Sequence, residues 1–204
     1  MLGLSFDGTQ LTLRRDLDQP VPTGDQALLK VRRAGICNTD LEIVKGYMGF
    51  RGILGHEFVA EVIAGAPEWI GQRVVGEINV ACGHCDLCLR GMLTQCRNRS
   101  TVGIDRYDGG FAEYLALTTR NLHRIPDSVS DDAAVFVEPL AAAFQLLESQ
   151  HISPHDRVVL IGAGKLGMLC AQVLKLTGAD VSVVVRRERP AALLAGWGIR
   201  AVTL

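Results

Sequence analysis

Four cysteines that lie close together in the chain constrain its folding most strongly. Cys82, Cys85, Cys88 and Cys96 follow the spacing C-x2-C-x2-C-x7-C. Short C-x2-C steps let successive thiolates converge on one ion, and the longer step returns Cys96 as the fourth ligand of a closed tetrahedral site. The spacing therefore predicts a structural Zn²⁺ site, which would hold together a lobe whose composition alone would not fold.

Other interpretations of these cysteines stay open. The bacterial [4Fe-4S] pattern begins with the same steps, but its next step is x3 and a proline follows, whereas here Arg97 follows Cys96 after x7. Loop cysteines without a metal are another alternative. Disulfides need an oxidising compartment, and the N-terminal residues have neither the basic segment nor the long apolar segment of an export signal. We therefore expect a cytoplasmic protein.

Charge and hydrophobicity limit what the chain binds. Lys plus Arg total 21 and Asp plus Glu total 22, and 48% of the 204 residues are hydrophobic. This composition predicts a folded chain. The formal net charge of −1 argues against nucleic acid or an anionic membrane as a partner, because both require a basic surface. The sequence contains no run of 18 apolar residues, so no membrane span is predicted. We therefore expect a small-molecule ligand.

The spacing of apolar residues changes along the chain. Residues 1–150 contain short apolar runs broken by Gly, Pro, Asn and Asp, which predicts a β-rich domain. A helix is expected from about Asp132, with Pro139 in its first turn, and the expected linker is the polar stretch SQHISPHD. Residues 151–204 have the order β-α-β-α-β with strongly apolar strands, which is typical of a parallel sheet.

A glycine-rich turn follows the first apolar run of residues 151–204. The run is RVVLI and the turn is GAGKLG. In this context Gly162 makes the tight turn, Gly164 admits a pyrophosphate and Gly167 packs the helix against the strand. The helix N-terminus then presents its positive end to the phosphates. We predict dinucleotide binding by Gly162, Gly164, Lys165, Leu166 and Gly167.

The residues after the second apolar run bear on which dinucleotide binds. VSVVV is followed by Arg186 and Arg187, and then by Glu188. An arginine in this position accommodates the 2′-phosphate of NADP, whereas an acid binds the ribose 2′-OH of NAD. The two arginines favour NADP. The alternative is that they form a solvated turn and that Glu188 reaches the ribose of NAD.

Cys37 and His56 indicate a second metal site. They lie in the segments GICNTD and GHE, beside the carboxylates Asp40 and Glu57. A thiolate and an imidazole supply part of an open zinc site, which needs a third protein ligand and keeps one position for substrate. Glu138, at the head of the expected helix, is the candidate third ligand. A buried thiol and a core histidine without metal are the alternative.

Taken together, these motifs resemble the zinc-dependent medium-chain alcohol dehydrogenase family. Six motifs occur in order over essentially the whole chain, namely GICNTD, GHE, the four-cysteine lobe, DGGFAEY, VEPLAAA and GAGKLG. The glutamate of VEPLAAA is similar to the polyol, threonine and glucose dehydrogenase branch. The resemblance implies a mixed α/β and β fold: a GroES-like β-rich catalytic domain with a structural zinc lobe at 1–150, then the N-terminal half of a Rossmann domain at 151–204.

The resemblance also implies a ligand set. Cys37, His56 and Glu138 match catalytic zinc ligands, with Glu138 binding directly or through water. Glu57 matches a neighbouring carboxylate that approaches the metal and exchanges with a ligand or water. With the four-cysteine site, two Zn²⁺ ions per chain are expected.

Roles in proton transfer follow from the same resemblance. Thr39 matches the hydroxyl that takes the alcohol proton, and Asp40 matches the acid that orients the histidine ligand. Many members have a histidine three residues after that hydroxyl, where this chain has Glu42. Relay of a proton through water and a plain solvated charge are both open for Glu42.

The activity implied is that of a zinc-dependent oxidoreductase. It would transfer hydride between NADP or NAD and a secondary alcohol or polyol-type substrate, or the corresponding carbonyl, as a homo-oligomer when full length. One alternative is a truncated, non-catalytic zinc and nucleotide binding protein. Another is a zinc-free quinone or enoyl reductase, a branch that generally lacks the paired zinc motifs. Because family members continue through the rest of the nucleotide sheet, we expect Leu204 to be a truncation point.

Overall fold

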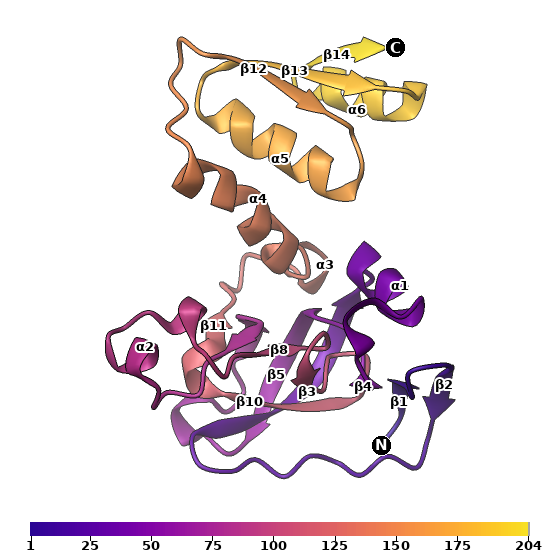
Figure 1. The fold of residues 1–204 in the computed structure, drawn as a ribbon, viewed down its shortest axis with the longest axis vertical. Helices are drawn as coiled ribbons and strands as arrows, with labels where there is room; N and C mark the ends of the chain where they lie inside the picture. Colours follow the sequence, from indigo (N-terminus) through magenta and orange to yellow (C-terminus); the bar gives the residue numbers. More distant parts are fainter. Residues whose placement is uncertain (204) are drawn as a thin grey trace. The chain divides into compact units, whose positions relative to one another are not determined.

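The computed structural model describes residues 1–203, and Leu204 lies outside the described residues. The chain divides into two compact units, Met1–Glu138 and Pro139–Leu204 (Figure 1). Helix α4 (Val137–Ser149) begins at this division. The predicted linker lies at the other end of the same helix, so a domain boundary near residue 150 stays a prediction.

Short strands build the first unit. Its strands are β1 (Gly3–Phe6), β2 (Leu11–Arg14), β3 (Gln26–Gly35), β4 (Gly52–Ile53), β5 (Glu57–Ala64), β6 (Arg73–Gly76), β7 (Asn79–Val80), β8 (Ser100–Val102), β9 (Arg106–Tyr107), β10 (Tyr114–Thr118) and β11 (Leu122–Arg124). Five of them form an antiparallel sheet in the order β10-β3-β5-β6-β11. The orders β2-β1-β4 and β7-β8-β9 make two three-stranded sheets. The prediction of a β-rich fold here is confirmed.

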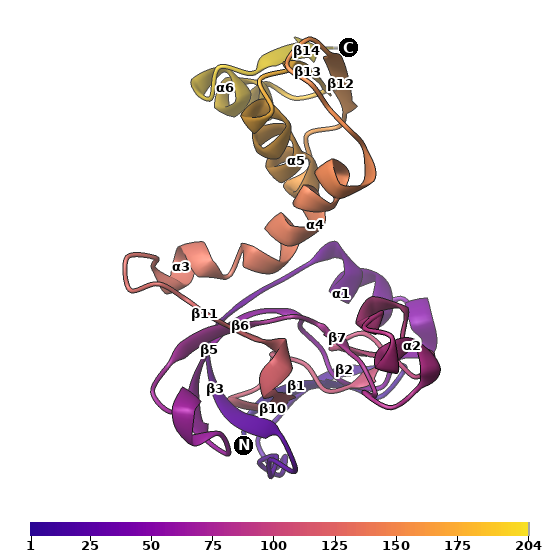
Figure 2. The same ribbon diagram turned by 90° about the vertical axis from the view of Figure 1, so that its left-hand side faces the viewer.

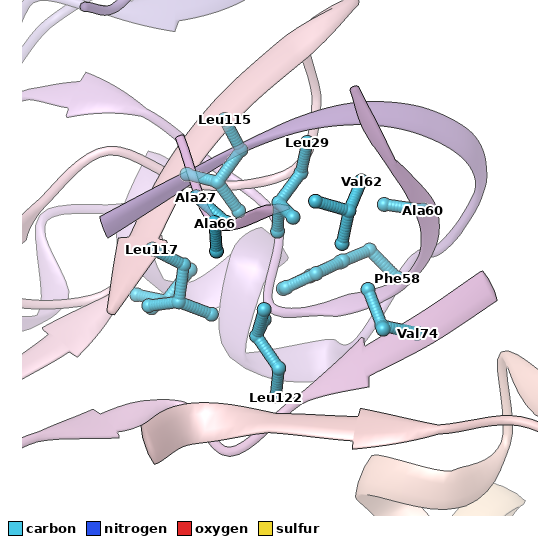
Figure 3. Close-up of a cluster of buried hydrophobic side chains, with 11 residues drawn as sticks. Ala27, Leu29, Phe58, Ala60, Val62, Ala66, Val74, Leu115, Leu117 and Leu122 are labelled. Carbon is cyan, nitrogen blue, oxygen red and sulfur yellow. The ribbon is translucent and has the colours of Figure 1, made fainter. Parts of the chain in front are cut away.

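A buried apolar cluster fills the concave side of the five-stranded sheet (Figure 3). Alternate residues of each strand point to the same face, and the register pairs Leu115 with Leu29 and Leu29 with Val62. Leu29, Val62 and Val74 have no exposed surface. This core packs the sheet together at β3 and β5, and the candidate site residues lie at the ends of these two strands.

Helices in the first unit are short. They are α1 (Asn38–Val44), α2 (Asp86–Leu89) and α3 (Asp131–Ala134). The single helix predicted from about Asp132 is divided into α3 and α4 by a turn at residues 135–136. Pro139 explains the break, because in a continuous helix its ring would clash with the carbonyl of Val135 and its nitrogen could donate no hydrogen bond.

The second unit has the predicted β-α-β-α-β order. Its elements after α4 are β12 (Arg157–Ile161), α5 (Lys165–Leu176), β13 (Asp180–Val185), α6 (Glu188–Gly196) and β14 (Arg200–Thr203). The strands are parallel in the order β12-β13-β14, and α5 and α6 lie on the same side of them (Figures 1 and 2). This is half of the doubly wound arrangement that the resemblance implies.

Packing within the second unit follows the apolar pattern of its strands. Val183 and Leu194 have no exposed surface in the cluster between the sheet and its helices. Helix α4 packs on α5 through Ala143, Cys170 and Val173, which agrees with Cys170 as a buried apolar residue without a chemical role. Among residues 1–203, no helix is both long enough and apolar enough to cross a membrane.

Leu29→Ala tests whether the sheet core carries the stability of the first unit. Leu29 is 0% exposed, so the cavity left behind is expected to lower the free energy of unfolding by about 2–5 kcal/mol, measured by chemical denaturation. The matched control is Leu13→Ala, because Leu13 is 58% exposed and its loss should change stability by less than about 0.5 kcal/mol. Equal effects of the two variants would contradict this account of the core.

Candidate metal and nucleotide sites

The four clustered cysteines converge as their spacing predicted. Their Sγ atoms all lie within 4.8 Å of one another, with Cys82 and Cys88 3.9 Å apart and Cys85 and Cys96 4.0 Å apart. Bonds of about 2.3 Å to a tetrahedral zinc place thiolates about 3.8 Å apart. The donor set therefore fits Zn²⁺, whereas a four-iron cluster would hold its thiolates farther apart.

Local structure brings these cysteines together. Cys85 is the N-cap residue of α2 and Cys88 lies within that helix. Cys96 follows the 3-10 turn η3 (Leu93–Gln95) and accepts a hydrogen bond from the backbone N–H of Cys82 at 3.3 Å. On the surface of the lobe, Arg97 donates two hydrogen bonds to Asp86, at 2.8 and 3.0 Å.

The thiols of this lobe differ in acidity. Backbone N–H groups, first that of His84, lower the pKa of Cys82 to about 6. Burial, together with hydrogen bonding to Cys85, raises the pKa of Cys88 to about 12. Such a set cannot ionise completely without a compensating charge, and a divalent cation supplies that charge.

A second group of metal donors includes Cys37 and His56, as the sequence predicted. Donor atoms of Cys37, His56 and Glu57 lie within 4.8 Å of one another. Cys37 caps α1 just after β3, and Glu57 begins β5, where it pairs with Gly35 of β3. A Cβ atom on Gly35 would collide with Oε2 of Glu57, so glycine at this position makes room for the carboxylate.

Asp40 connects Cys37 to His56. Its Oδ2 accepts a hydrogen bond from the backbone N–H of Cys37 at 2.8 Å, and its Oδ1 lies 3.3 Å from Nδ1 of His56. Both side chains are 3% exposed. The Oδ1 and Nδ1 atoms are not aligned as a hydrogen bond, and neither has another partner in residues 1–203. Because Nδ1 faces Asp40, the ring is oriented with Nε2 available to a metal.

Electrostatics at His56 favour a positive charge. Burial opposes the charged form, but the nearby carboxylate of Asp40 outweighs it and raises the pKa of His56 to about 9. A position that attracts a proton in this way also attracts a metal ion, which competes with the proton for the ring nitrogen.

The loop that presents His56 is braced by the DGG segment. The N–H groups of Gly109 and Phe111 donate to the carbonyls of Ile53 and Leu54 at 2.7 and 2.9 Å. A Cβ atom on Gly109 would collide with the carbonyl oxygen of Gly55. The glycines of this motif therefore allow two backbones to approach closely and fix the start of β5.

Glu138 lies outside the set of three mutually close donors, although its charge interacts with His56. Burial is the main reason that the pKa of Glu138 is raised, and the negative charges of Glu57 and Glu77 add to it. Sequence analysis missed Glu77; an acid directly after the apolar run RVVG was its only signal. These carboxylates repel one another, and a cation would compensate them.

Two residues with expected roles in proton transfer lie on α1. Thr39 is in the first turn, and the Cys37 thiol donates to its Oγ1 at 3.6 Å. Glu42 forms an ion pair with Lys45 at 2.8 Å, and the two side chains are 57% and 69% exposed. This pairing agrees with the interpretation of Glu42 as a solvated charge.

The glycine-rich turn borders a cavity of about 880 Å³. Gly162 adopts a φ of 102°, which favours glycine. A Cβ atom on Gly167 would collide with the carbonyl oxygen of Gly162, whereas one on Gly164 would meet nothing within 4 Å. Close packing at Gly167 and open space at Gly164 agree with the roles predicted for them, and Lys165 and Leu166 begin α5 beside them.

The end of β13 forms the other side of this cavity. Arg186 and Arg187 are among its lining residues, and within the described residues Glu188 is not. Glu188 instead begins α6. A cavity between a glycine turn and a strand end is the expected place for a dinucleotide.

Family models match both units of the chain. Residues 23–127 match the alcohol dehydrogenase GroES-like domain. Residues 157–195 match the model described as pyridine nucleotide-disulphide oxidoreductase.

Curated relatives include L-threonine 3-dehydrogenases. That of Shewanella woodyi is 37% identical over 179 residues, which are 83% of this chain and 52% of the relative. That of Alteromonas mediterranea is 36% identical over 180 residues, with the same coverage of 83% and 52%. The chain spans about half the length of the curated relatives it matches.

Solved structures with a similar fold include dehydrogenases with bound cofactor. An alcohol dehydrogenase (rspB) from E. coli CFT073, complexed with NADH, has a TM-score of 0.91 at 29% identity, covering 100% of this chain and 62% of that chain. A zinc-binding dehydrogenase from Sinorhizobium meliloti 1021, bound to NADP, has a TM-score of 0.89 at 30% identity, with 100% and 61% covered.

Asp40→Asn tests how the Cys37 and His56 donors are oriented. Loss of the carboxylate charge beside Nδ1 is expected to lower metal affinity at this site roughly 10- to 100-fold. The four-cysteine site should be unaffected. The measurement is the metal retained per chain during titration with a chelator. Glu42→Gln, which removes an exposed charge from the same helix, is the control, and an equal result for both variants would contradict the role of Asp40.

Proposed function

Because the chain belongs to the zinc-dependent medium-chain alcohol dehydrogenase family, we propose that it carries the metal and nucleotide sites of an oxidoreductase. The reaction is hydride transfer between NADP or NAD and a secondary alcohol or polyol-type substrate. The observation that carries the proposal is the convergence of Cys37, His56 and Glu57, with Asp40 orienting the histidine. The 3-hydroxyl of L-threonine, the substrate named for the relatives, is itself a secondary alcohol.

The residues of the candidate catalytic metal site have different roles in this proposal. Cys37 and His56 would hold the ion, and either Glu57 or Glu138 would complete the protein ligands, directly or through water. Zinc, when bound, supplies a Lewis acid that favours the deprotonated form of an alcohol. Thr39 lies beside Cys37, and its hydroxyl would accept the proton of the substrate hydroxyl while passing its own proton on to solvent.

The second unit positions the cofactor. The turn from Gly162 to Gly167 and the first residues of α5, Lys165 and Leu166, approach the pyrophosphate. Arg186 and Arg187 would lie at the adenosine ribose and favour NADP through its 2′-phosphate. Their place in the lining of the cavity supports this assignment.

Finer properties belong to the same proposal. We infer a cytoplasmic homo-oligomer that acts on a small alcohol or carbonyl and has no nucleic-acid or membrane partner. The net charge of −1 supports the absence of polyanionic partners. The four clustered cysteines, arranged without an open position, support a structural role for the ion that they would hold.

Removal of a donor tests the catalytic assignment. Cys37→Ala and His56→Ala, made in the full-length protein, are expected to abolish turnover and to lower bound zinc from two ions per chain to one. The readouts are NADP- or NAD-linked oxidation of secondary alcohols and elemental analysis. Cys170→Ala removes a buried cysteine on α5 and serves as the control. Retained activity in Cys37→Ala would refute the assignment, and one zinc in the unaltered protein would favour a non-catalytic binding protein.

Cofactor preference has its own test. Arg186→Gln and Arg187→Gln each remove a charged donor for the 2′-phosphate, an interaction worth about 1.5–3 kcal/mol. The Kd for NADP is therefore expected to rise roughly 10- to 100-fold, whereas the Kd for NAD should barely change. The control is Arg189→Gln on α6. A strong preference of the unaltered protein for NAD would overturn the NADP assignment.

A further inference from the structure

Arg73 connects the five-stranded sheet to the turn at residues 126–131, which leads into α3, through hydrogen bonds. It is the first residue of β6, and its side chain is 21% exposed. Nη1 donates to Oδ1 of Asp131 at 2.7 Å, and Nη2 donates to the carbonyls of Pro126 and Val129 at 3.0 and 2.9 Å. One guanidinium thus satisfies three acceptors spread over a single turn, a geometry that a planar, multidentate donor allows.

The carboxylate of Asp131 is held from a second side as well. Its Oδ2 accepts from Nε of Arg32 at 2.7 Å, and Nη1 of Arg32 donates to Glu61 at 3.0 Å. Hydrogen bonds from Arg32 and Arg73 keep the pKa of Asp131 below its ordinary value. Because both carboxylate oxygens are engaged from different strands, the first residue of α3 is fixed in position and direction.

Helix α3, which precedes Glu138 in the chain, is itself held in place by a cap and by packing. The side chain of Ser130 caps the helix by accepting from the N–H of Ala133 at 3.2 Å. Ala134 has no exposed surface and packs in a cluster with Val59, Val75 and Ile125.

The helical path nearly continues beyond α3. The N–H of Val135 donates to Asp131 at 3.1 Å, and that of Phe136 donates to Ala133 at 3.2 Å. Asp131 and Ala134 are spaced i and i+3, which places them on one face of α3, and the turn at residues 135–136 leads from them to Glu138. Asp131 and Ala134 on that face are anchored to the sheet, and Glu138 comes one turn later.

We infer that Arg73 is a positioning residue for the metal site: by binding Asp131 and the turn at residues 126–131, it fixes Glu138 close to Cys37 and His56 and so sets the metal affinity. The inference rests on the proposed metal site. A neighbouring pair provides a contrast. Arg33 contacts Asp132 at 2.9 Å, but the two side chains are 60% and 80% exposed, and an exposed pair of this kind contributes little.

Arg73→Met and the control Arg33→Met test the inference in the full-length protein. Metal affinity at each site is measured by competition with a chelator, and the visible spectrum of Co²⁺ bound at the Cys37 site reports its geometry. Arg73→Met is expected to lower affinity at the Cys37 site about 10-fold and to alter the Co²⁺ spectrum, while the four-cysteine site is unchanged. Arg33→Met should leave both sites unchanged. Equal weakening of both sites in Arg73→Met would overturn the inference in favour of a general structural role.

A double-mutant cycle with Glu138→Gln tests whether Arg73 acts through Glu138. If it does, Arg73→Met has no further effect on metal affinity in the Glu138→Gln background. Equal losses in both backgrounds would overturn the inference. If Arg73→Met does not fold, Arg73→Lys replaces it; a single ammonium cannot reach all three acceptors, so part of the affinity loss is still expected, and full affinity would count against the inference.

Failure of this inference and failure of the proposed function are distinguishable. Unaltered protein that binds metal only at the four-cysteine site would overturn the proposed function. Unaltered protein that binds metal at both sites, together with wild-type affinity and spectrum in Arg73→Met, would overturn the role of Arg73 alone.

Discussion

The buried carboxylate of Asp40 is the interaction on which the candidate catalytic site depends. A charge this far from solvent is costly unless both of its oxygens are compensated. Here the backbone N–H of Cys37 compensates one oxygen and His56 faces the other. The end of β3, the start of α1 and the loop before β5 must therefore keep their relative positions. Gly35 and Gly109 make this possible, because a side chain at either position would collide with a neighbouring segment. The backbone is therefore arranged so that Asp40 contacts His56 and orients it as a metal ligand.

Both metal sites share one electrostatic argument. Each brings together acidic groups that cannot all ionise without a compensating positive charge. In the cysteine lobe, burial and neighbouring thiols raise the pKa of Cys88, while backbone N–H groups lower that of Cys82. At the second site, burial and the nearby acids raise the pKa of Glu138. Divalent cations would remove this repulsion, which would couple metal binding to folding in the first case and leave a compensated, open site in the second.

Residue spacing predicted the cysteine lobe, the glycine turn and the β-rich unit, because each depends on local chemistry. Long-range geometry was harder to predict. Glu57 follows His56 directly, and neighbours on a strand point to opposite faces; both reach the site because His56 precedes β5 and Gly35 leaves room. The contact of Arg73 with Asp131 joins residues 58 positions apart, and no local pattern records it. The break before α4 was readable from Pro139, but the run of helix-forming residues obscured it.

Two carboxylates, Glu57 and Glu138, are candidate metal ligands beside Cys37 and His56, and different contacts fix them. Glu57 is fixed by the ladder between β3 and β5, where it pairs with Gly35, two residues before Cys37. Glu138 arrives from a helical turn that is separate from the sheet and held to it by Arg73 and Asp131. If Glu138 binds the metal, the position of that turn would set how near its carboxylate comes, while Cys37, His56 and Asp40 keep their geometry. The contacts of Arg73 with Asp131 and the turn at residues 126–131, more than the sheet, would then decide which carboxylate leaves a position open for substrate.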